Sequence, residues 1–325
     1  MPNKVDLSII VPMYNEQEVL EHFFTHIEKV MKQVPQYLYE IICVNDGSKD
    51  ETLTLLKKYA QKDKRIKIIG FSRNFHKEPA LFAGIENCTG RAAVLIDADL
   101  QDPPELILQF LQKWEEGYQV VYGKREDRKT DSFIKRGTSA AFYKVYNWMA
   151  DYPIPYNAGD FRLIDRKVID AIKKITEKQL FMKGILNWVG FKSIGIPYTR
   201  PARVAGKTKW NYWKLWNFAL DGITSSTTLP LRIWTYVGSL MAFVSLLYGL
   251  YIALRTLIYG IDVPGYASLL VCILFLGGVQ FLVLGILGEY IARIQIEVKN
   301  RPPYLIDQKI NFDSTPVLRK KKASK

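Results

Sequence analysis

The chain has 325 residues, of which 48% are hydrophobic and 24% are charged, so it is long enough for one sizeable soluble domain and further segments. Its formal net charge of +13 would suit a nucleic-acid-binding protein, but no recognisable nucleic-acid-binding module is present. The 3 cysteines have neither metal-ligand spacing nor evident disulfide partners, which fits a reducing compartment.

The part of the chain up to Gly123 alternates short apolar runs with helical patterns. Runs rich in β-branched and apolar residues predict strands at Leu7–Val11, Glu40–Val44, Ile66–Phe71, Ala92–Ile96 and Gln119–Tyr122. Helical patterns fill the intervals, and Ser48 with Glu51 predicts a capping box at the start of the second helix. Strands separated by helices of this length favour an α/β fold with a mostly parallel sheet.

The regular alternation ends after Gly123. Residues Ser132–Met149 form a helical pattern rich in Lys, Arg and aromatic residues, and a proline-rich turn then leads to Gly159–Arg162. A mixed segment to about Pro201 completes the predicted globular part. Residues Trp210–Ser225 have the pattern of an amphipathic helix that lies in a membrane interface.

Two long uncharged segments follow, Ile233–Leu254 and Val263–Gly288. Each exceeds the roughly 20 residues that a helix needs to cross a bilayer, and is too long for the alternative of an ordinary buried core helix. Basic residues lie before the first segment and after the second, so the positive-inside rule predicts a transmembrane hairpin with both flanks in the cytoplasm. No signal peptide is evident, and we expect the chain to begin in the cytoplasm.

Acidic residues follow three of the predicted strands, at the point where each strand ends. Glu16 follows the first strand, Asp46 the second, and Asp97 with Asp99 the fourth. Doubly wound folds bind nucleotides at this edge, and Asp46 is suited to hold a nucleobase or ribose. A divalent cation between Asp97, Asp99 and a phosphate-bearing ligand would offset the repulsion between the two carboxylates. The alternatives are a solvated turn at Asp97–Asp99 and a turn former at Asp46.

Three groups of residues together resemble a known enzyme family. Val11–Glu16, Asn45–Ser48 and Asp97–Asp99 are similar to motifs of the inverting family 2 glycosyltransferases, which use nucleotide sugars on a GT-A fold. The longer stretch Asp99–Pro104 is similar to the polyprenyl-phosphate glycosyltransferase branch of that family. Neither a Gly-x-Gly-x-x-Gly fingerprint nor a Walker-type phosphate loop with correct spacing is present, and the Gln-x-x-Arg-Trp signature of processive polysaccharide synthases is absent too.

The rest of the chain narrows the resemblance to the bactoprenol glucosyltransferases of O-antigen modification. The similarity runs from about Val5 to Tyr304, which is nearly the whole chain. The further motifs that carry it are Gly159–Leu163, Phe181–Gly184, Gly206–Trp210 and Leu287–Ile291 at the end of the second uncharged segment. The order and joint presence of these motifs make the resemblance specific.

The resemblance implies roles for individual residues. Pro12, Tyr14, Glu16 and Asp46 would contact the nucleoside, and the nucleotide-sugar site would also include Asp97, Ala98, Asp99, Arg203, Lys207 and Lys209. Asp97, Asp99 and Gln101 would hold Mg²⁺ or Mn²⁺ against the diphosphate. Arg125, Arg136 and Ser139 would bind the acceptor phosphate. For the basic residues, the alternative is a cationic face toward the membrane.

Asp160 occupies the position of the family's candidate catalytic acid–base residue. The acceptor would be a phosphate monoester whose second pKa is about 6, so little base catalysis is needed at neutral pH. We therefore expect Asp160 mainly to position other groups, while Arg125 and Arg136 align the nucleophile. One departure from the family is His76, where we expect Gly in relatives. His adopts a left-handed turn less readily than Gly, which leaves the conformation of this loop open.

As a whole, the resemblance implies a membrane enzyme with a GT-A domain at 1–206, a juxtamembrane amphipathic helix at 207–230, a two-helix transmembrane hairpin at 231–293 and a basic cytoplasmic tail at 294–325. It would transfer glucose from UDP-glucose to undecaprenyl phosphate at the inner face of the bacterial cytoplasmic membrane, as a homo-oligomer, a tetramer by resemblance. The alternatives are another donor, GDP-mannose or another UDP-sugar such as a UDP-aminopentose, and a non-catalytic membrane scaffold.

Overall fold

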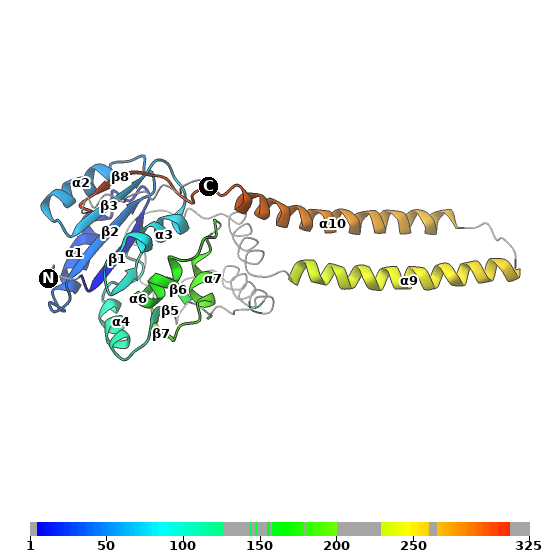
Figure 1. Ribbon diagram of the computed structural model, residues 1–325, viewed down its shortest axis with the longest axis horizontal. Helices are drawn as coiled ribbons and strands as arrows, with labels where there is room; N and C mark the ends of the chain where they lie inside the picture. The colour runs from blue at the N-terminus through cyan, green and yellow to red at the C-terminus, as the bar shows by residue number, and fades with distance from the viewer. Residues whose placement is uncertain are drawn as a thin grey trace, which may run out of the picture. The chain divides into compact units, whose positions relative to one another are not determined.

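The structure is a computed structural model, and it describes residues 5–125, 144, 147, 155–156, 158–178, 180–199, 229–259 and 265–312. The chain divides into two compact units (Figure 1). The first unit is an α/β domain, which takes up most of the described residues before residue 200 and those after residue 301. The second unit contains a pair of long helices.

The first unit alternates strands and helices as the sequence predicts. Its strands are β1 (Leu7–Met13), β2 (Tyr39–Asn45), β3 (Ile66–Phe71), β4 (Ala92–Leu95), β5 (Val120–Arg125), β6 (Ala158–Asp165), β7 (Ser193–Tyr198) and β8 (Ile306–Ile310). Its helices are α1 (Leu20–Met31), α2 (Thr52–Lys62), α3 (Lys77–Asn87), α4 (Leu106–Glu115), α6 (Arg166–Ile172) and α7 (Met182–Trp188). Strands β1 to β5 lie where the apolar runs predict them, so this part of the prediction is confirmed.

The strands form one sheet in the order β7-β5-β6-β4-β1-β2-β3-β8. β1 pairs in parallel with β2 and β4, β2 with β3, and β5 with β7, whereas β6 runs antiparallel to both β4 and β5. The chain leaves β1 toward β2 and β3 and then returns to the other side of β1 as β4. Open α/β sheets bind their ligands at such a reversal of strand order, outside the carboxyl ends of the strands.

Alternate residues of the central strands face opposite layers of helices. Ile9 and Val11 of β1 belong to a buried cluster with residues of α1, α2 and α4, whereas Ile10 belongs to a second cluster with residues of α3, α6 and α7. Successive side chains of a strand point to opposite faces, so an unbroken apolar run fills both layers. Gly84 lets α3 approach closely, because a Cβ there would lie 2.2 Å from Ile10 Cγ2.

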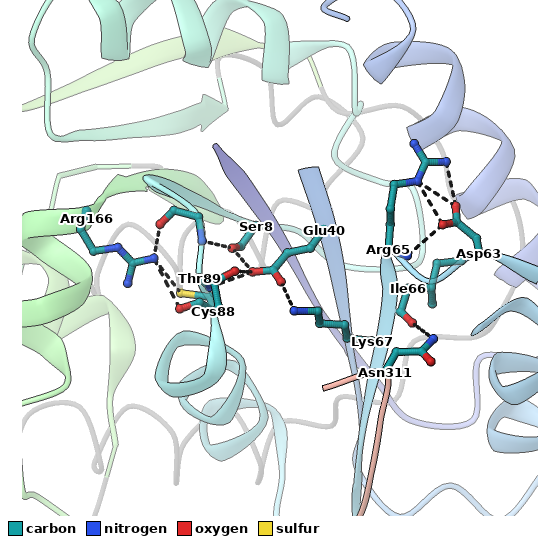
Figure 2. A network of polar contacts seen from close by, with 11 residues as sticks. Ser8, Glu40, Asp63, Arg65, Ile66, Lys67, Cys88, Thr89, Arg166 and Asn311 are labelled. Carbon is teal, nitrogen blue, oxygen red and sulfur yellow. Dashed lines mark hydrogen bonds and ion pairs between the residues drawn. The ribbon is translucent and has the colours of Figure 1, made fainter. Parts of the chain in front are cut away.

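A buried carboxylate ties β1, β2 and β3 together near the amino ends of β1 and β2 (Figure 2). Glu40 is 2% exposed, and it accepts hydrogen bonds from Ser8 Oγ at 2.6 Å and from the Thr89 amide at 2.8 Å. Lys67 Nζ lies 2.7 Å from its second oxygen. Burial alone would raise the pKa of Glu40, but Lys67 and the hydrogen bonds outweigh burial and lower it. Buried charge that is paired in this way holds the strands together.

The last strand lies within residues 294–325, which the sequence predicts to be a basic tail. Residues Ile306–Ile310 form β8, which pairs antiparallel with β3 at the edge of the sheet. Beyond β8, the side-chain amide of Asn311 donates to the carbonyl oxygens of Ala60 at 2.7 Å and Ile66 at 2.8 Å, the second of which is drawn in Figure 2. The segment covers an edge that would otherwise expose unpaired backbone groups.

The second unit contains α9 (Leu229–Tyr259) and α10 (Tyr266–Val298), which lie antiparallel and contact each other (Figure 1). Among the described residues, one helical stretch is long and apolar enough to cross a membrane, Phe275–Val298 in α10. It begins later than the predicted segment Val263–Gly288, and the other predicted span, Ile233–Leu254, stays a prediction. The helices predicted at 132–149 and 210–225 lie outside the described residues, apart from residues 144 and 147.

Candidate active site

The loops that follow β1 and β2 are hydrogen-bonded to each other. The backbone amide of Asn15 donates to Ser48 Oγ at 3.0 Å, and that of Glu16 donates to Thr52 Oγ1 at 2.9 Å. Asn15 has a φ of 53°, a left-handed conformation that Asn tolerates better than most residues. The capping box predicted at Ser48 is wrong, because its hydroxyl accepts from Asn15 and α2 begins without a side-chain cap.

Asp46 is fixed by both its backbone and its side chain. Its amide donates to the Met13 carbonyl at 2.9 Å, and its Oδ1 accepts from the Phe75 amide at 2.6 Å. Asp46 is 3% exposed, and this burial raises the pKa of its carboxyl. The next residue, Gly47, has a φ of 62°, and a Cβ there would lie 2.4 Å from the carbonyl carbon of Arg73. The loop after β3 therefore packs directly on the turn that carries Asp46.

The acidic loop after β4 begins where the strand order reverses. Asp97 and Asp99 are partly exposed, whereas Ala98 and Gln101 are 4% and 6% exposed. Asp99 Oδ1 accepts from the Gln101 amide at 3.2 Å, and Leu100 between them has a φ of 54°. Over the residues that the structure describes, no group of three or more His, Cys, Asp or Glu side chains forms a metal site. Binding of Mg²⁺ or Mn²⁺ by Asp97, Asp99 and Gln101 stays a prediction.

Strand β6 places Asp160 beside this acidic loop. Leu95 of β4 pairs with Arg162 of β6 in an antiparallel ladder. Continuing that register by two residues brings Asp97 level with Asp160, because the amino end of β6 and the carboxyl end of β4 share one edge. Arg162 is 3% exposed, and its guanidinium donates to the Gly159 carbonyl at 2.7 Å, which holds the start of the strand.

Two lysines hold the carboxylate of Asp160. Lys77 begins α3, and its Nζ lies 2.9 Å from Asp160 Oδ2 and 2.7 Å from the Asp97 carboxylate. Lys183 of α7 lies 3.2 Å from the other oxygen, Asp160 Oδ1. Burial opposes ionisation, but the ammonium groups of Lys183 and Lys77 hold the pKa of Asp160 well below its ordinary value. A carboxylate with so low a pKa is a weak proton acceptor at neutral pH.

Glu78 ties the beginnings of α3 and α7 together beside these lysines. Its Oε2 accepts from the Met182 amide at 3.0 Å. Burial, together with the negative charge of Asp160, raises the pKa of Glu78 to about 7. The site therefore combines one carboxyl group that stays ionised with another that titrates near neutral pH.

Arg125, which ends β5, is held by a chain of polar contacts. Its Nε donates to Tyr198 Oη at 3.4 Å, and the Tyr198 hydroxyl in turn donates to the Asp102 carboxylate. Asp102 is 2% exposed, and burial together with this carboxylate raises the pKa of Tyr198. The other predicted phosphate-binding residues, Arg136, Ser139, Arg203, Lys207 and Lys209, lie outside the described residues.

Comparison with known proteins identifies the family of this chain. Residues 8–173 match the family described as glycosyl transferase family 2. The chain belongs to glycosyl transferase family 2. Residues 229–294 of this family 2 glycosyltransferase also match a family described as the GtrB C-terminal hairpin, which covers most of α9 and α10. The resemblance inferred from the sequence motifs is confirmed, and the α/β sheet agrees with the GT-A fold that it implies.

The sequence of this family 2 glycosyltransferase is similar to those of relatives over nearly their whole length. An uncharacterized glycosyltransferase from Synechocystis sp. is 51% identical over 313 residues, which cover 96% of this chain and 98% of the relative. The SfII prophage-derived bactoprenol glucosyl transferase of Shigella flexneri is 50% identical over 300 residues, covering 92% and 97%. A prophage bactoprenol glucosyl transferase homolog of Escherichia coli is 49% identical over 300 residues, covering 92% and 98%.

The structure brings some predicted site residues together and adds others. Asp97 and Asp160 are linked through Lys77, while Pro12, Tyr14 and Glu16 are partly exposed on β1 and the loop after it. Four residues of the site have no role that follows from the sequence motifs: Lys77, Glu78, Lys183 and Tyr198. Lys183 lies in a motif that the resemblance singled out, and Lys77 and Glu78 directly follow His76. His76 has a φ of 75°, so the positive φ that suits Gly is present there despite the His side chain.

Proposed function

We propose that this family 2 glycosyltransferase transfers glucose from UDP-glucose to undecaprenyl phosphate and gives polyprenyl-phosphate glucose with inversion at the anomeric carbon. An oxygen of the acceptor phosphate forms a bond to C1 of glucose while the bond from C1 to the UDP oxygen breaks, and UDP leaves. The observation that carries the proposal is the 50% identity to a bactoprenol glucosyl transferase over 92% of the chain, which includes the hairpin.

Asp160 acts in this proposal by positioning other groups. Its low pKa makes it a poor base, and the acceptor phosphate, with a second pKa of about 6, is mostly dianionic at pH 7. The nucleophile therefore reaches the site already deprotonated. Asp160 instead holds Lys77 and Lys183, whose ammonium groups lie 2.9 Å and 3.2 Å from its oxygens. Asp160 thereby orients the two lysines in advance, while Arg125 provides positive charge near the reacting phosphates.

A divalent cation, Mg²⁺ or Mn²⁺, fits the chemistry of the loop after β4. Asp97 and Asp99 offer carboxylate oxygens, which are the hard ligands that these ions prefer, and both residues are partly exposed. Two protein carboxylates leave other positions for diphosphate oxygens and water, as is usual for Mg²⁺. When bound, the ion neutralises charge that develops on the leaving diphosphate. Gln101 would be the third residue to hold the ion; it is 6% exposed, and its amide donates to Asp99 Oδ1.

The remaining predicted phosphate contacts are part of the proposal. Arg125, Arg136 and Ser139 would bind the acceptor phosphate, and Arg203, Lys207 and Lys209 would lie near the donor phosphates. Pro12, Tyr14, Glu16 and Asp46 would contact the nucleoside. The support for Asp46 is its fixed position at the carboxyl end of β2, next to the reversal of strand order.

The membrane anchor in this proposal is a hairpin of α9 and α10, with the catalytic domain and both ends of the chain in the cytoplasm. A polyprenyl chain stays in the bilayer, so the transferase must work at the membrane surface. Both helices expose large apolar side chains, which suits contact with lipid; examples are Tyr236, Phe243, Leu257, Ile273 and Phe281. Association of the enzyme through these helices, as a tetramer, belongs to the same proposal.

A donor panel tests the proposed function. The purified protein in detergent is incubated with undecaprenyl phosphate, Mg²⁺ or Mn²⁺, and labelled UDP-glucose, GDP-mannose or a UDP-aminopentose. We expect transfer from UDP-glucose alone to give a lipid-phosphate sugar with a β-linkage. Preferential transfer from GDP-mannose would move the assignment to a mannosyltransferase. Absence of transfer from every donor, with an active relative as positive control, would favour the non-catalytic scaffold.

A further inference from the structure

After α10 the chain returns to the first unit. We call Tyr304–Phe312 the return segment; it contains β8 and belongs to the same compact unit as β3. β8 pairs antiparallel along β3 as far as Phe71, the last residue of that strand. The carbonyl of Leu305 also accepts from the amide of Ser72 at 3.1 Å. The return segment therefore holds β3 up to the first residue of the loop that follows it.

A chain of aromatic rings leads from the return segment into that loop. Tyr304 stacks on Phe71 with ring centroids 4.9 Å apart and ring planes 13° from parallel. Phe71 packs edge-on against Phe75, at 5.7 Å and 89°. The guanidinium of Arg73 lies 4.0 Å from the centroid of the Phe75 ring and covers it from the loop itself. The Tyr304 hydroxyl also donates to Glu86 of α3, in addition to the ring contacts.

Phe75 is also the residue through which the loop holds Asp46. Its amide donates to Asp46 Oδ1 at 2.6 Å, so a displacement of Phe75 removes a hydrogen bond from a carboxyl group that is 3% exposed. The same loop packs its backbone at Arg73 against Gly47, where no Cβ would fit. The position of Asp46 thus depends on the conformation of residues 72–76, and that conformation depends in part on the ring of Tyr304.

We propose that Tyr304 is a positioning residue for the nucleotide site, acting through Phe71 and Phe75 on Asp46. The inference rests on the proposed function, because it takes Asp46 to be a nucleoside contact. It means that donor affinity is set in part by a residue that follows both long helices in the sequence. The return segment is then a working part of the catalytic domain, and a fragment that ends at Arg301 would bind nucleotide poorly.

The test uses the full-length protein in detergent and UDP as the probe. Tyr304→Leu removes the ring, Tyr304→Phe keeps the ring but loses the bond to Glu86, and Lys309→Ala is the matched control. Lys309 lies on β8 and donates to Asn87 Oδ1 at 2.6 Å, outside the chain of rings. UDP affinity is measured by calorimetry, and hydrogen–deuterium exchange is followed in the peptide that covers residues 72–77.

For Tyr304→Leu we expect the UDP Kd to rise about two- to tenfold, as for the loss of an aromatic pair, with faster exchange at residues 72–77. The donor KM should rise with it, while kcat changes less. Tyr304→Phe and Lys309→Ala should stay close to the wild type in both measurements. If Tyr304→Leu does not fold, Tyr304→Met replaces it with the same expected results, because Met has a similar volume and its flexible side chain fills irregular gaps.

Two outcomes would overturn the inference. One is an unchanged UDP affinity and unchanged exchange in Tyr304→Leu. The other is an equal loss in Tyr304→Leu and Lys309→Ala, which would show a general loosening of β8. A wild-type protein that neither binds UDP nor transfers a sugar refutes the proposed function instead. In that case, the exchange comparison still decides whether Tyr304 holds the loop.

Discussion

Replacing Asp160 with Asn separates a positioning role from a role as general base. Its oxygens lie 2.9 Å from Lys77 Nζ and 3.2 Å from Lys183 Nζ, and its side chain is 34% exposed. Exposed ion pairs contribute about 0–1 kcal/mol, and breaking a buried pair costs about 3–5 kcal/mol. Because the side chain is about one third exposed, Asp160→Asn should lower the free energy of unfolding by about 2 kcal/mol, a value between these two ranges. Thermal unfolding of Asp160→Asn should therefore occur about 4–8 °C below that of the wild type.

In the transfer assay, Asp160→Asn should lower kcat about 10- to 100-fold, because the two lysines lose the group that holds them. UDP affinity should stay near the wild-type value. The nucleophile is a phosphate with a second pKa of about 6, so kcat should fall below about pH 6 in the wild type and in the variant alike. The measurement is the initial rate of glucose transfer to undecaprenyl phosphate between about pH 5.5 and pH 8.5.

Asp165→Asn is the matched control for this substitution. Asp165 lies on the same strand at its other end, where its Oδ1 accepts from the Lys167 amide at 2.9 Å and caps α6. Its transfer rate should equal that of the wild type. A complete loss of transfer in Asp160→Asn, with UDP and acceptor binding intact, would refute the positioning role and restore the general-base interpretation.

Three further predictions concern the metal, a titrating carboxyl and the support of Arg125. EDTA should abolish transfer, and addition of Mg²⁺ or Mn²⁺ should restore it. Asp99→Asn should need a higher metal concentration for its half-maximal rate. Full activity in excess EDTA would contradict the metal role. The pKa of Glu78 is raised from 4.5 to about 7, so its stabilising contribution, at most about 3 kcal/mol, is complete below pH 4.5 and lost as the pH rises through about 7. The melting temperature of Glu78→Gln should therefore fall less with rising pH than that of the wild type, and at about pH 8 the variant should melt at the higher temperature. If both melting temperatures fall equally with pH, the titrating group is not Glu78. Tyr198→Phe removes a hydrogen bond to the buried Asp102 carboxylate and should destabilise the protein by about 1.5–3 kcal/mol in thermal unfolding. An equal loss in the control Tyr122→Phe would show that the effect does not come from this hydrogen bond.

Strands β1 to β4 could be predicted from the sequence because buried apolar residues dominate both faces of each strand. Ile9, Ile10 and Val11 are all 0% exposed, so β1 appears in the sequence as an apolar run interrupted only by the buried Ser8. The acids that follow such runs then lie at one edge by the geometry of parallel strands alone. Asp46 and Asp97 are therefore at the predicted edge, and their local hydrogen bonds add detail that the spacing does not contain.

The rest could not be predicted because it depends on pairing between distant segments. Asp160 lies beside Asp97 only because β6 inserts antiparallel between β4 and β5, and nothing local to residues 158–165 specifies that partner. Strand β8 has only two apolar residues among five, Ile306 and Ile310, and does not stand out from the polar sequence around it. The direction of β6 and the return of β8 are set by which sheet edges remain available once the parallel strands have formed.

The charge of the cluster around Asp160 decides what its residues can contribute to transfer. Asp97 and Asp160 carry two negative charges, and Lys77 and Lys183 carry two positive charges, so the cluster is neutral before any substrate arrives. In the proposed function, a nucleoside diphosphate and a phosphate dianion would both bring negative charge to it. These four side chains cannot balance that charge by themselves. In the proposed function, the balance would come from a divalent cation at Asp97 and Asp99 and from basic residues such as Arg125. In that function the cluster would orient groups in advance, and the rate would depend on the charges that are added around it when the two phosphates bind.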